Sequence, residues 1–202
     1  MVQIHLIRHG KRERRLVTDP SLTDDGRVEA RLVADALVDM KIAAVFSSPL
    51  ARAKETAEIL AVRLKLDVVE DVRLRERMNW GDVIGQSFDD FVAMWDRCSH
   101  DRDYRPVGAD SSRDAGKRIE AFVARCDAQE FDGDVVAVAH GGIIADFLLN
   151  VFSADALAQV RPEFCENPYS GDIMRECSIT TVTYNEGDYR IEAIGQAAYW
   201  MG

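Results

Sequence analysis

Two stretches of the sequence end in residues that can hold and attack an anionic group. The segment Ile4–Gly10 runs from apolar residues into Arg8 and His9, and the segment Val135–Gly142 runs from apolar residues into His140. Near physiological pH an imidazole is largely neutral and therefore nucleophilic. A guanidinium presents a planar fork of donors that fits phosphate or carboxylate oxygens. Together these residue types predict chemistry on an anion.

The elements that must position these residues are strands of an open sheet. Short apolar runs that stop at a turn residue are typical of parallel strands, whose carboxyl ends share the edge where ligands bind. A third strand is predicted at Ala43–Phe46, and the helix after it carries Arg52 in its opening turns. Ser48 as N-cap and Pro49 at the first helical position mark the start of that helix. We therefore expect both histidines and both arginines at one sheet edge, where helix N-termini help to hold a dianion.

Strands and helices alternate along most of the chain, which predicts a three-layer α/β/α sandwich around a mostly parallel sheet. Helices are predicted from Thr23, over Ser112–Ala128 and over Ile143–Val151, because apolar residues recur there at helical spacing. The last two strands flank Asn185–Asp188, a turn sequence that predicts a hairpin. With 202 residues and no linker or repeat, residues 1–202 are expected to form a single domain.

Composition restricts the classes of partner and the cellular location. The net charge of −10 argues against nucleic acid and anionic membrane surfaces as general partners. The longest apolar runs are too short to cross a bilayer, and the N-terminus lacks the apolar core of a signal peptide. A soluble, cytoplasmic protein is therefore expected. The four cysteines have no CxxC pairing, which favours reduced thiols.

A basic loop follows the first histidine and bears on how an acidic protein attracts an anion. Lys11, Arg12, Arg14 and Arg15 lie together within five residues, with Glu13 among them. A local cationic patch offsets the repulsion that a net negative protein exerts on an anionic substrate. Two interpretations stay open: the loop contacts a second anionic group of the substrate, or it is a solvated loop with Glu13 as an internal partner.

The ordered set of motifs resembles the histidine phosphatase superfamily, also called phosphoglycerate mutase-like, and the resemblance spans nearly the whole chain. Each motif is weak alone, but the set in this order is highly specific. The residues that carry the resemblance are Leu6–Gly10, Leu22-Thr23 with Gly26, Ser47–Ala53 with Thr56-Ala57, Glu76 ahead of Gly81 and Gly85, Gly108–Ser111 with Arg118, and His140–Gly142.

The resemblance implies a role for each matching residue. His9 is the implied nucleophile, which takes the phosphoryl group and gives a phosphohistidine intermediate. Arg8, Arg52 and His140 are implied to hold the phosphoryl oxygens. Glu76 is implied to protonate the leaving oxygen and then to activate water. Because phosphoryl transfer needs mainly positioning and charge stabilisation, two guanidiniums and an imidazole can replace Mg²⁺, so no metal or other cofactor is expected.

The rest of the substrate is expected to meet residues around this centre. Four cations are candidates for substrate contacts: Lys11, Arg12, Arg15 and Arg77. A short lid-like segment is predicted at about residues 86–110. Trp80 and Trp95 are expected to pack in the core or the lid rather than to serve as platforms for the substrate.

The resemblance predicts a metal-independent phosphatase that hydrolyses phosphomonoesters of small metabolites. Phosphoglycerate mutase-type transfer is the alternative, disfavoured because true mutases of this type usually carry longer insertions than the segment Gly85–Gly108. A catalytically silent, phospholigand-binding protein is a third alternative. The family's C-terminal histidine-containing segment is replaced by Ala198–Trp200, which leaves the substrate open. The oligomeric state is also open.

Overall fold

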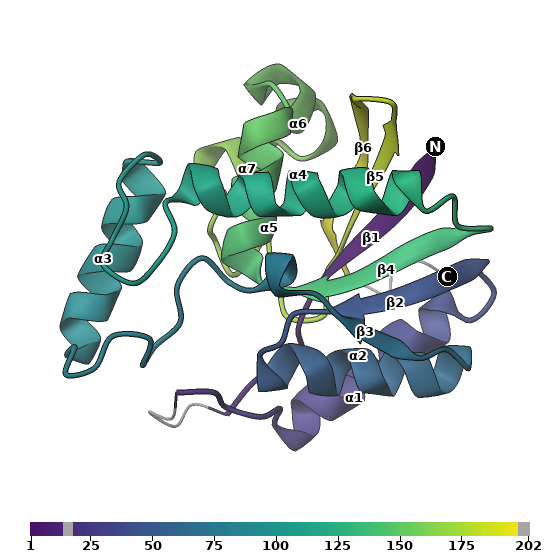
Figure 1. Cartoon of the computed structure of the whole chain (residues 1–202), viewed down its shortest axis with the longest axis horizontal. Helices are drawn as coiled ribbons and strands as arrows, with labels where there is room; N and C mark the ends of the chain where they lie inside the picture. The colour runs from purple at the N-terminus through teal and green to yellow at the C-terminus, as the bar shows by residue number, and fades with distance from the viewer. Residues whose placement is uncertain (14–17, 198–202) are drawn as a thin grey trace.

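A computed structural model gives the fold of residues 1–13 and 18–197. Strands and helices alternate along most of the chain, as the sequence predicted (Figure 1). The strands are β1 Val2–Arg8, β2 Ile42–Ser47, β3 Val68–Glu70, β4 Asp134–Ala139, β5 Ile179–Asn185 and β6 Asp188–Gln196. The helices are α1 Asp24–Leu37, α2 Ala51–Leu64, α3 Phe88–His100, α4 Ser112–Ala128, α5 Gly141–Val151, α6 Ala154–Val160 and α7 Pro162–Glu166, with a 3-10 turn, η1, at Val72–Leu74.

The six strands form one sheet in the order β3-β2-β4-β1-β5-β6. Strands β1 to β4 pair in parallel, whereas β5 pairs antiparallel with both β1 and β6, so the predicted mostly parallel sheet is confirmed. Strands β1 and β4 are direct neighbours, and their register ends with Arg8 opposite Ala139. His9 directly follows Arg8, and His140 directly follows Ala139. Parallel pairing in this register therefore brings the two histidines together.

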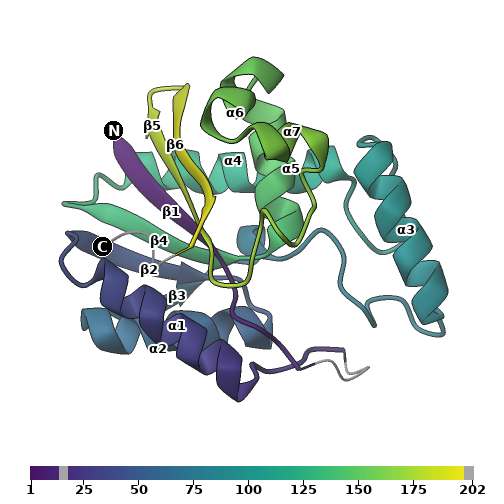
Figure 2. The ribbon, with the colours of Figure 1, turned by 180° about the vertical axis from the view of Figure 1, so that it is seen from behind.

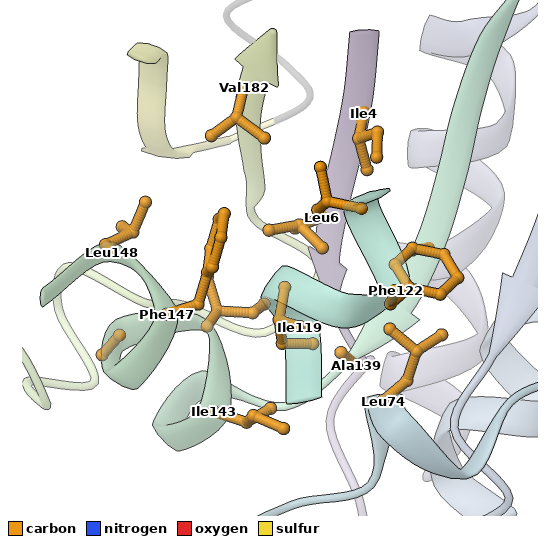
Figure 3. Packing of buried hydrophobic residues seen from close by; sticks show 14 of the residues in the cluster. Ile4, Leu6, Leu74, Ile119, Phe122, Ala139, Ile143, Phe147, Leu148 and Val182 are labelled. Atoms are coloured by element: carbon orange, nitrogen blue, oxygen red, sulfur yellow. The ribbon is translucent and has the colours of Figure 1, made fainter. Parts of the chain in front are cut away.

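Helices cover both faces of the sheet, which confirms the predicted three-layer sandwich (Figures 1 and 2). On β1, Ile4 and Leu6 pack with α4 and α5, whereas Ile7 packs with α1 and α2. This division follows from the alternation of side chains along a strand. Figure 3 shows the first of these two clusters, in which Phe122 of α4 and Phe147 of α5 lie against the sheet residues.

The chain leaves the two central strands toward opposite faces of the sheet. After β1 it runs to α1, which packs on one face, and after β4 it enters α5, which packs on the other. A crevice opens outside the carboxyl ends of neighbouring strands where successive connections diverge in this way. The fold therefore places a binding site next to His9 and His140.

One predicted helix start is wrong by two residues. Helix α2 begins at Ala51 rather than at Pro49, and its N-cap residue, Leu50, makes no side-chain cap. The carboxylate of Asp19 takes the capping role instead and accepts the backbone N–H of Ala51 at 2.9 and 3.0 Å. The hydroxyl of Ser48 accepts the N–H of Leu50, one residue before the helix, at 3.3 Å, and it lies 2.8 Å from Nε2 of His140. The prediction at Thr23 is confirmed, since its hydroxyl accepts the N–H of Gly26.

Helix α3 stands apart from the sheet, at one side of the molecule (Figures 1 and 2). Ser87 caps its first turn, and Cys98 is the residue of this helix that is buried. The segment therefore has little core of its own, which is compatible with the predicted lid around residues 86–110. Helix α7 was not predicted, because five residues are too few to give a helical pattern. No helix within residues 1–13 and 18–197 has the length and apolar character that crossing a membrane requires.

Candidate functional site

A cavity of about 520 Å³ lies at the carboxyl ends of the central strands. Five of the predicted site residues line it, namely Arg8, His9, Arg12, Arg52 and Glu76. They come from the end of β1, the loop after it, the start of α2 and the loop after η1. The structure thus brings together groups that lie up to 68 positions apart in the sequence (76 − 8). This volume falls within the range of small-molecule sites in proteins.

The imidazole of His9 is held as a neutral base. Its Nδ1 lies 2.8 Å from the carbonyl oxygen of Gly10, and because a carbonyl can only accept, Nδ1 carries the proton. The lone pair is then on Nε2, which accepts the Nε–H of Arg52 at 3.1 Å. Burial lowers the pKa of His9 well below 6.5, and the positive charges of Arg52 and Arg8 lower it further. His9 therefore offers a nucleophilic nitrogen at neutral pH.

Gly10 is required by a close approach rather than by an unusual backbone angle. A Cβ atom at this position would lie 2.7 Å from the carbonyl oxygen of Gly26, in the first turn of α1. The loop after His9 is thereby packed directly against the backbone of α1. This contact fixes the position of the Gly10 carbonyl, which in turn orients the His9 ring.

His140 lies beside His9, with ring centroids 5.1 Å apart and planes tilted by 60°. Its Nε2 is 2.8 Å from the hydroxyl oxygen of Ser48, which accepts the N–H of Leu50 at 3.3 Å. The serine hydroxyl proton is thus available for Nε2, an arrangement that leaves the imidazole proton on Nδ1. Burial lowers the pKa of His140 well below 6.5, and the charge of Arg52 adds to that effect. His140 is therefore a neutral donor.

The two arginines differ in how they are balanced by carboxylates. Arg8 donates to the carboxylate of Glu176 at 2.8 Å and to the carbonyl oxygen of Met174. Arg52 is almost fully buried, and its Nη1 lies 3.7 Å from the carboxylate of Asp19, beyond hydrogen-bond distance. Burial lowers the pKa of Arg52 to about 10, so the guanidinium stays positively charged at neutral pH.

Two buried donors in this cluster have no hydrogen-bond partner within the described residues. They are Nη1 of Arg52 and Nδ1 of His140. A buried polar group without a partner costs about 1–3 kcal/mol, so such groups call for an explanation. Both belong to residues that touch His9, one by a hydrogen bond and the other by ring contact. Oxygens of a tetrahedral anion bound at His9 Nε2 would satisfy both donors.

Glu76 lines the same cavity, and backbone groups fix the position of its carboxylate. Its two carboxylate oxygens accept the backbone N–H groups of Arg77, at 3.0 Å, and of Gly142, at 3.1 Å. A Cβ at Gly142 would lie 2.8 Å from Oε1 of Glu76 and 2.6 Å from the ring of Trp95, so a larger residue here would displace one or both of these side chains. A carboxyl group held in this way can give a proton to a leaving oxygen or take one from water.

Arg77 does not line the cavity, contrary to the prediction that it contacts the substrate. Its guanidinium is fully buried and donates to Asp146 at 3.1 Å and to Ser112 at 3.0 Å. The rings of Trp95 and Tyr169 lie 4.0 and 4.6 Å from its central carbon. Its charge is therefore used inside the protein, where it ties α3 to α4 and α5 directly behind Glu76.

Replacement of Arg77 by methionine is expected to destabilise the protein by about 3–5 kcal/mol, because it leaves the Asp146 carboxylate buried without its cation. Denaturant unfolding measures this loss. The matched control is Arg63→Met, which removes the half-exposed partner of Asp35 and is expected to cost no more than about 1 kcal/mol. Equal losses in the two variants would contradict a structural role for Arg77.

The two described cations of the basic loop, Lys11 and Arg12, have different surroundings. Arg12 lines the cavity, whereas Nζ of Lys11 contacts the carboxylate of Asp25 at 2.7 Å outside it. Burial lowers the pKa of Arg12, the charge of Arg8 lowers it further, and Glu176 raises it, so Arg12 belongs to the same cluster of charges as Arg8. Arg14 and Arg15 lie outside the described residues. A substrate contact by Arg12 stays a prediction.

The sequence interpretation missed several residues that surround the centre. Ser48 was interpreted as a helix cap, and Asp19 and Glu176, which balance the two arginines, carry no local pattern. Trp80 and Trp95 were expected to pack in the core or lid, but both line the cavity.

Within residues 1–13 and 18–197, no group of three or more His, Cys, Asp or Glu side chains is arranged to hold a metal ion.

The buried histidines predict an acid-sensitive fold. Because the folded protein keeps His140 neutral while the unfolded chain protonates it near pH 6.5, the free energy of unfolding falls as the pH drops below that value, by up to about 1.4 kcal/mol per pH unit for each such group. His5 and His9 contribute in the same sense. Burial raises the pKa of Asp146 to about 6, which acts in the opposite sense.

Unfolding measured between about pH 7 and pH 5.5 in the wild type and in His140→Asn tests this expectation. The titration of Asp146 occurs in both proteins, so it cancels in the comparison. The free energy of unfolding of the variant is expected to depend less steeply on pH than that of the wild type. Parallel curves would mean that His140 takes up its proton as readily in the folded protein as in the unfolded chain.

Three comparisons relate this chain to known proteins. A sequence model of the histidine phosphatase superfamily (branch 1) matches residues 4–197. The probable phosphoglycerate mutase GpmB of Salmonella paratyphi A is 28% identical over 200 residues, which cover 94% of this chain and 88% of that protein.

Solved structures are similar over almost the full length. The mycobacterial glucosyl-3-phosphoglycerate phosphatase, in a complex with VO3, aligns with a TM-score of 0.72 and 26% identity over 97% of this chain and 100% of that one. YhfR of Bacillus stearothermophilus aligns with a TM-score of 0.72 and 22% identity over 97% of this chain and 98% of that one, a likeness of fold.

Proposed function

The chain belongs to the histidine phosphatase superfamily, branch 1, and we propose that it is a phosphatase that hydrolyses phosphomonoesters through a phosphohistidine at His9. The observation that carries this proposal is the neutral Nε2 of His9, held beside two buried donors without a partner in the described residues. A nucleophile is useful only where the anion it attacks is also stabilised. Here the nucleophilic nitrogen and the donors that would stabilise the anion belong to residues in direct contact with one another.

In the first step, Nε2 of His9 attacks phosphorus and forms the P–N bond while the P–O bond to the alcohol breaks. Arg52 moves its hydrogen bond from Nε2 to a phosphoryl oxygen, which frees the lone pair. Arg8, Arg52 and His140 hold the phosphoryl oxygens, and Arg12 adds charge to the same cluster. Since the transition state has a loose phosphoryl group, this positioning and charge supply most of the catalysis.

Glu76 handles the proton in both steps. In its protonated form it gives the proton to the departing alkoxide, so a neutral alcohol leaves. The resulting carboxylate then takes a proton from water as the water oxygen attacks phosphorus, the P–N bond breaks and inorganic phosphate leaves. A general acid and base of this kind contributes about 10²–10⁴-fold to the rate. The site returns to its starting state with a neutral His9.

Hydrolysis is favoured over mutase transfer by the access of water to the cavity. Phe88 and Val92, which line it, are 47% and 40% exposed. A mutase must keep water from the phosphoenzyme until the phosphoryl group returns to an alcohol. Mutase transfer is the second candidate, since the Salmonella relative carries the name of a probable phosphoglycerate mutase.

A panel of phosphorylated metabolites, assayed for released inorganic phosphate with and without a chelator, tests the proposal. We expect phosphate release that the chelator leaves unchanged. With 3-phosphoglycerate, the isomer ratio is followed in the same samples. Interconversion of isomers without phosphate release would establish the mutase instead. Binding of vanadate without turnover of any ester would favour the non-catalytic alternative.

A further inference from the structure

Four aromatic side chains form a continuous surface along one side of the cavity. They are Trp80, Phe88, Phe91 and Trp95, here called the aromatic wall, and all four line the cavity. The ring centroids of Trp80 lie 5.4 Å from Phe88 and 5.8 Å from Phe91, and those of Phe91 and Trp95 are 6.3 Å apart. The spacing is that of interacting aromatic pairs. Three of the four rings come from α3, which stands away from the core (Figure 2).

The aromatic wall begins next to the reacting groups. The ring of Trp95 packs against Gly142, whose N–H holds the carboxylate of Glu76. At the other end, Phe88 is 47% exposed to solvent. The wall therefore leads from the proton donor of the leaving oxygen to the surface. The alcohol part of a phosphomonoester, which extends from that oxygen, would lie along it.

Two polar groups of other residues that line the cavity already donate hydrogen bonds within the protein. The amide nitrogen of Asn79 donates to the carbonyl oxygens of Thr18 and Trp80, and the hydroxyl of Tyr169 donates to Asp146 at 2.6 Å. A sugar or a polyol that covers the faces of the rings would exchange hydrogen bonds to water for mainly apolar contacts, at a cost in affinity.

The positive charges that line the cavity are gathered around His9. Of the described residues that line it, the charged ones are Arg8, Arg12, Arg52 and Glu76. The pKa of Arg52 is lowered by Arg12 and Arg8 as well as by burial, so these cations lie together around His9. A second phosphate or carboxylate on an alcohol part that lies along the aromatic wall would face rings instead of cations. The cavity thus favours one anionic group and an uncharged remainder.

We propose that the aromatic wall selects phosphomonoesters whose alcohol part is apolar, above all aromatic. This inference rests on the proposed function for the identity of the anion, a phosphoryl group at His9. Covering Phe88, Phe91 and Val92 with a ring removes apolar surface from water and adds stacking contacts. The selection acts on the alcohol, independently of the chemistry at phosphorus.

The test compares 2-phenylethyl phosphate with ethyl phosphate and glycerol 1-phosphate, whose leaving alcohols are of similar basicity. This choice keeps the need for general acid catalysis nearly constant. We expect kcat/KM to be roughly tenfold or more higher for the phenylethyl ester. In Phe88→Ala and Phe91→Ala that preference is expected to shrink severalfold. The control is Ile84→Ala, which changes a fully exposed side chain outside the cavity and is expected to keep the wild-type preference.

Equal kcat/KM for the three esters, or an equal loss on all of them in the Phe88 and Phe91 variants, would overturn the inference and leave the proposed function intact. Binding of 2-phenylethylphosphonate and ethylphosphonate, which cannot be hydrolysed, separates selection from catalysis. We expect the first to bind about tenfold more tightly. Tighter binding of 2-phenylethylphosphonate, together with no turnover of any ester, would support the inference and overturn the proposed function. Equal binding would overturn the inference.

Discussion

His9→Ala is expected to reduce kcat for phosphomonoester hydrolysis by roughly 10⁴-fold or more, because the imidazole makes the bond that replaces the substrate ester. The fold is expected to persist, since the backbone N–H of His9 still donates to the carbonyl oxygen of Ala139 at 3.0 Å. Steady-state kinetics measures the loss, and circular dichroism with thermal unfolding verifies the fold.

His100→Ala is the matched control, because His100 is an exposed histidine at the end of α3 whose Nδ1 contacts the carbonyl oxygen of Asp96. This variant is expected to keep wild-type kcat. Normal turnover by a folded His9→Ala protein would remove His9 from the role of nucleophile.

Glu76→Gln is expected to slow hydrolysis of alkyl phosphates by about 10²–10⁴-fold, the usual contribution of a general acid. For an aryl ester with an acidic phenol, the rate of the first step is expected to fall much less, because a stable phenolate hardly needs a proton as it departs. The amide keeps the shape of the carboxylate and the contact of one oxygen with a backbone N–H. Burst kinetics with p-nitrophenyl phosphate isolates this first step from the attack of water.

Glu58→Gln, at an exposed position on α2, is the control and is expected to leave both substrates unaffected. If the burst with the aryl ester and the turnover of an alkyl ester fall by the same factor in Glu76→Gln, the carboxyl group is not the acid. A role in positioning the phosphoryl group or the loop after η1 would then explain the lower rates.

The sheet and the positions of the two histidines were predictable from local pattern. Each histidine follows a buried apolar strand, and the carboxyl ends of parallel strands share one edge of a sheet. The register of β1 against β4 then makes His9 and His140 neighbours. Both strands contribute apolar residues to the clusters on both faces of the sheet, although only β4 is a continuous apolar run, Val135–Ala139, whereas β1 is interrupted by Gln3 and His5.

Contacts between distant segments were not predictable in the same way. The cap of α2 is Asp19, a residue 32 positions before Ala51, so the serine and proline next to the helix gave the wrong start. Arg77 was a candidate for substrate contact because it follows Glu76. Its partner Asp146 lies 69 positions away, and no local pattern identifies a buried ion pair of that kind.

The aromatic wall illustrates a further limit of sequence patterns. The spacing of Phe88, Phe91 and Trp95 on α3 predicts an apolar face of a helix, and it does so correctly. An apolar face usually packs on a core. Here it lines a cavity, because the helix stands away from the sheet (Figure 1). Only the three-dimensional arrangement distinguishes the two cases.

The most direct test of the account is to trap the phosphoenzyme. The protein is mixed with a ³²P-labelled phosphomonoester, quenched in alkali within its turnover time, and digested for mass spectrometry. The account predicts a label that is stable in alkali, labile in acid, located on the peptide that contains His9, and missing from His9→Ala. A label that survives acid, or one on another residue, would contradict a phosphohistidine at His9.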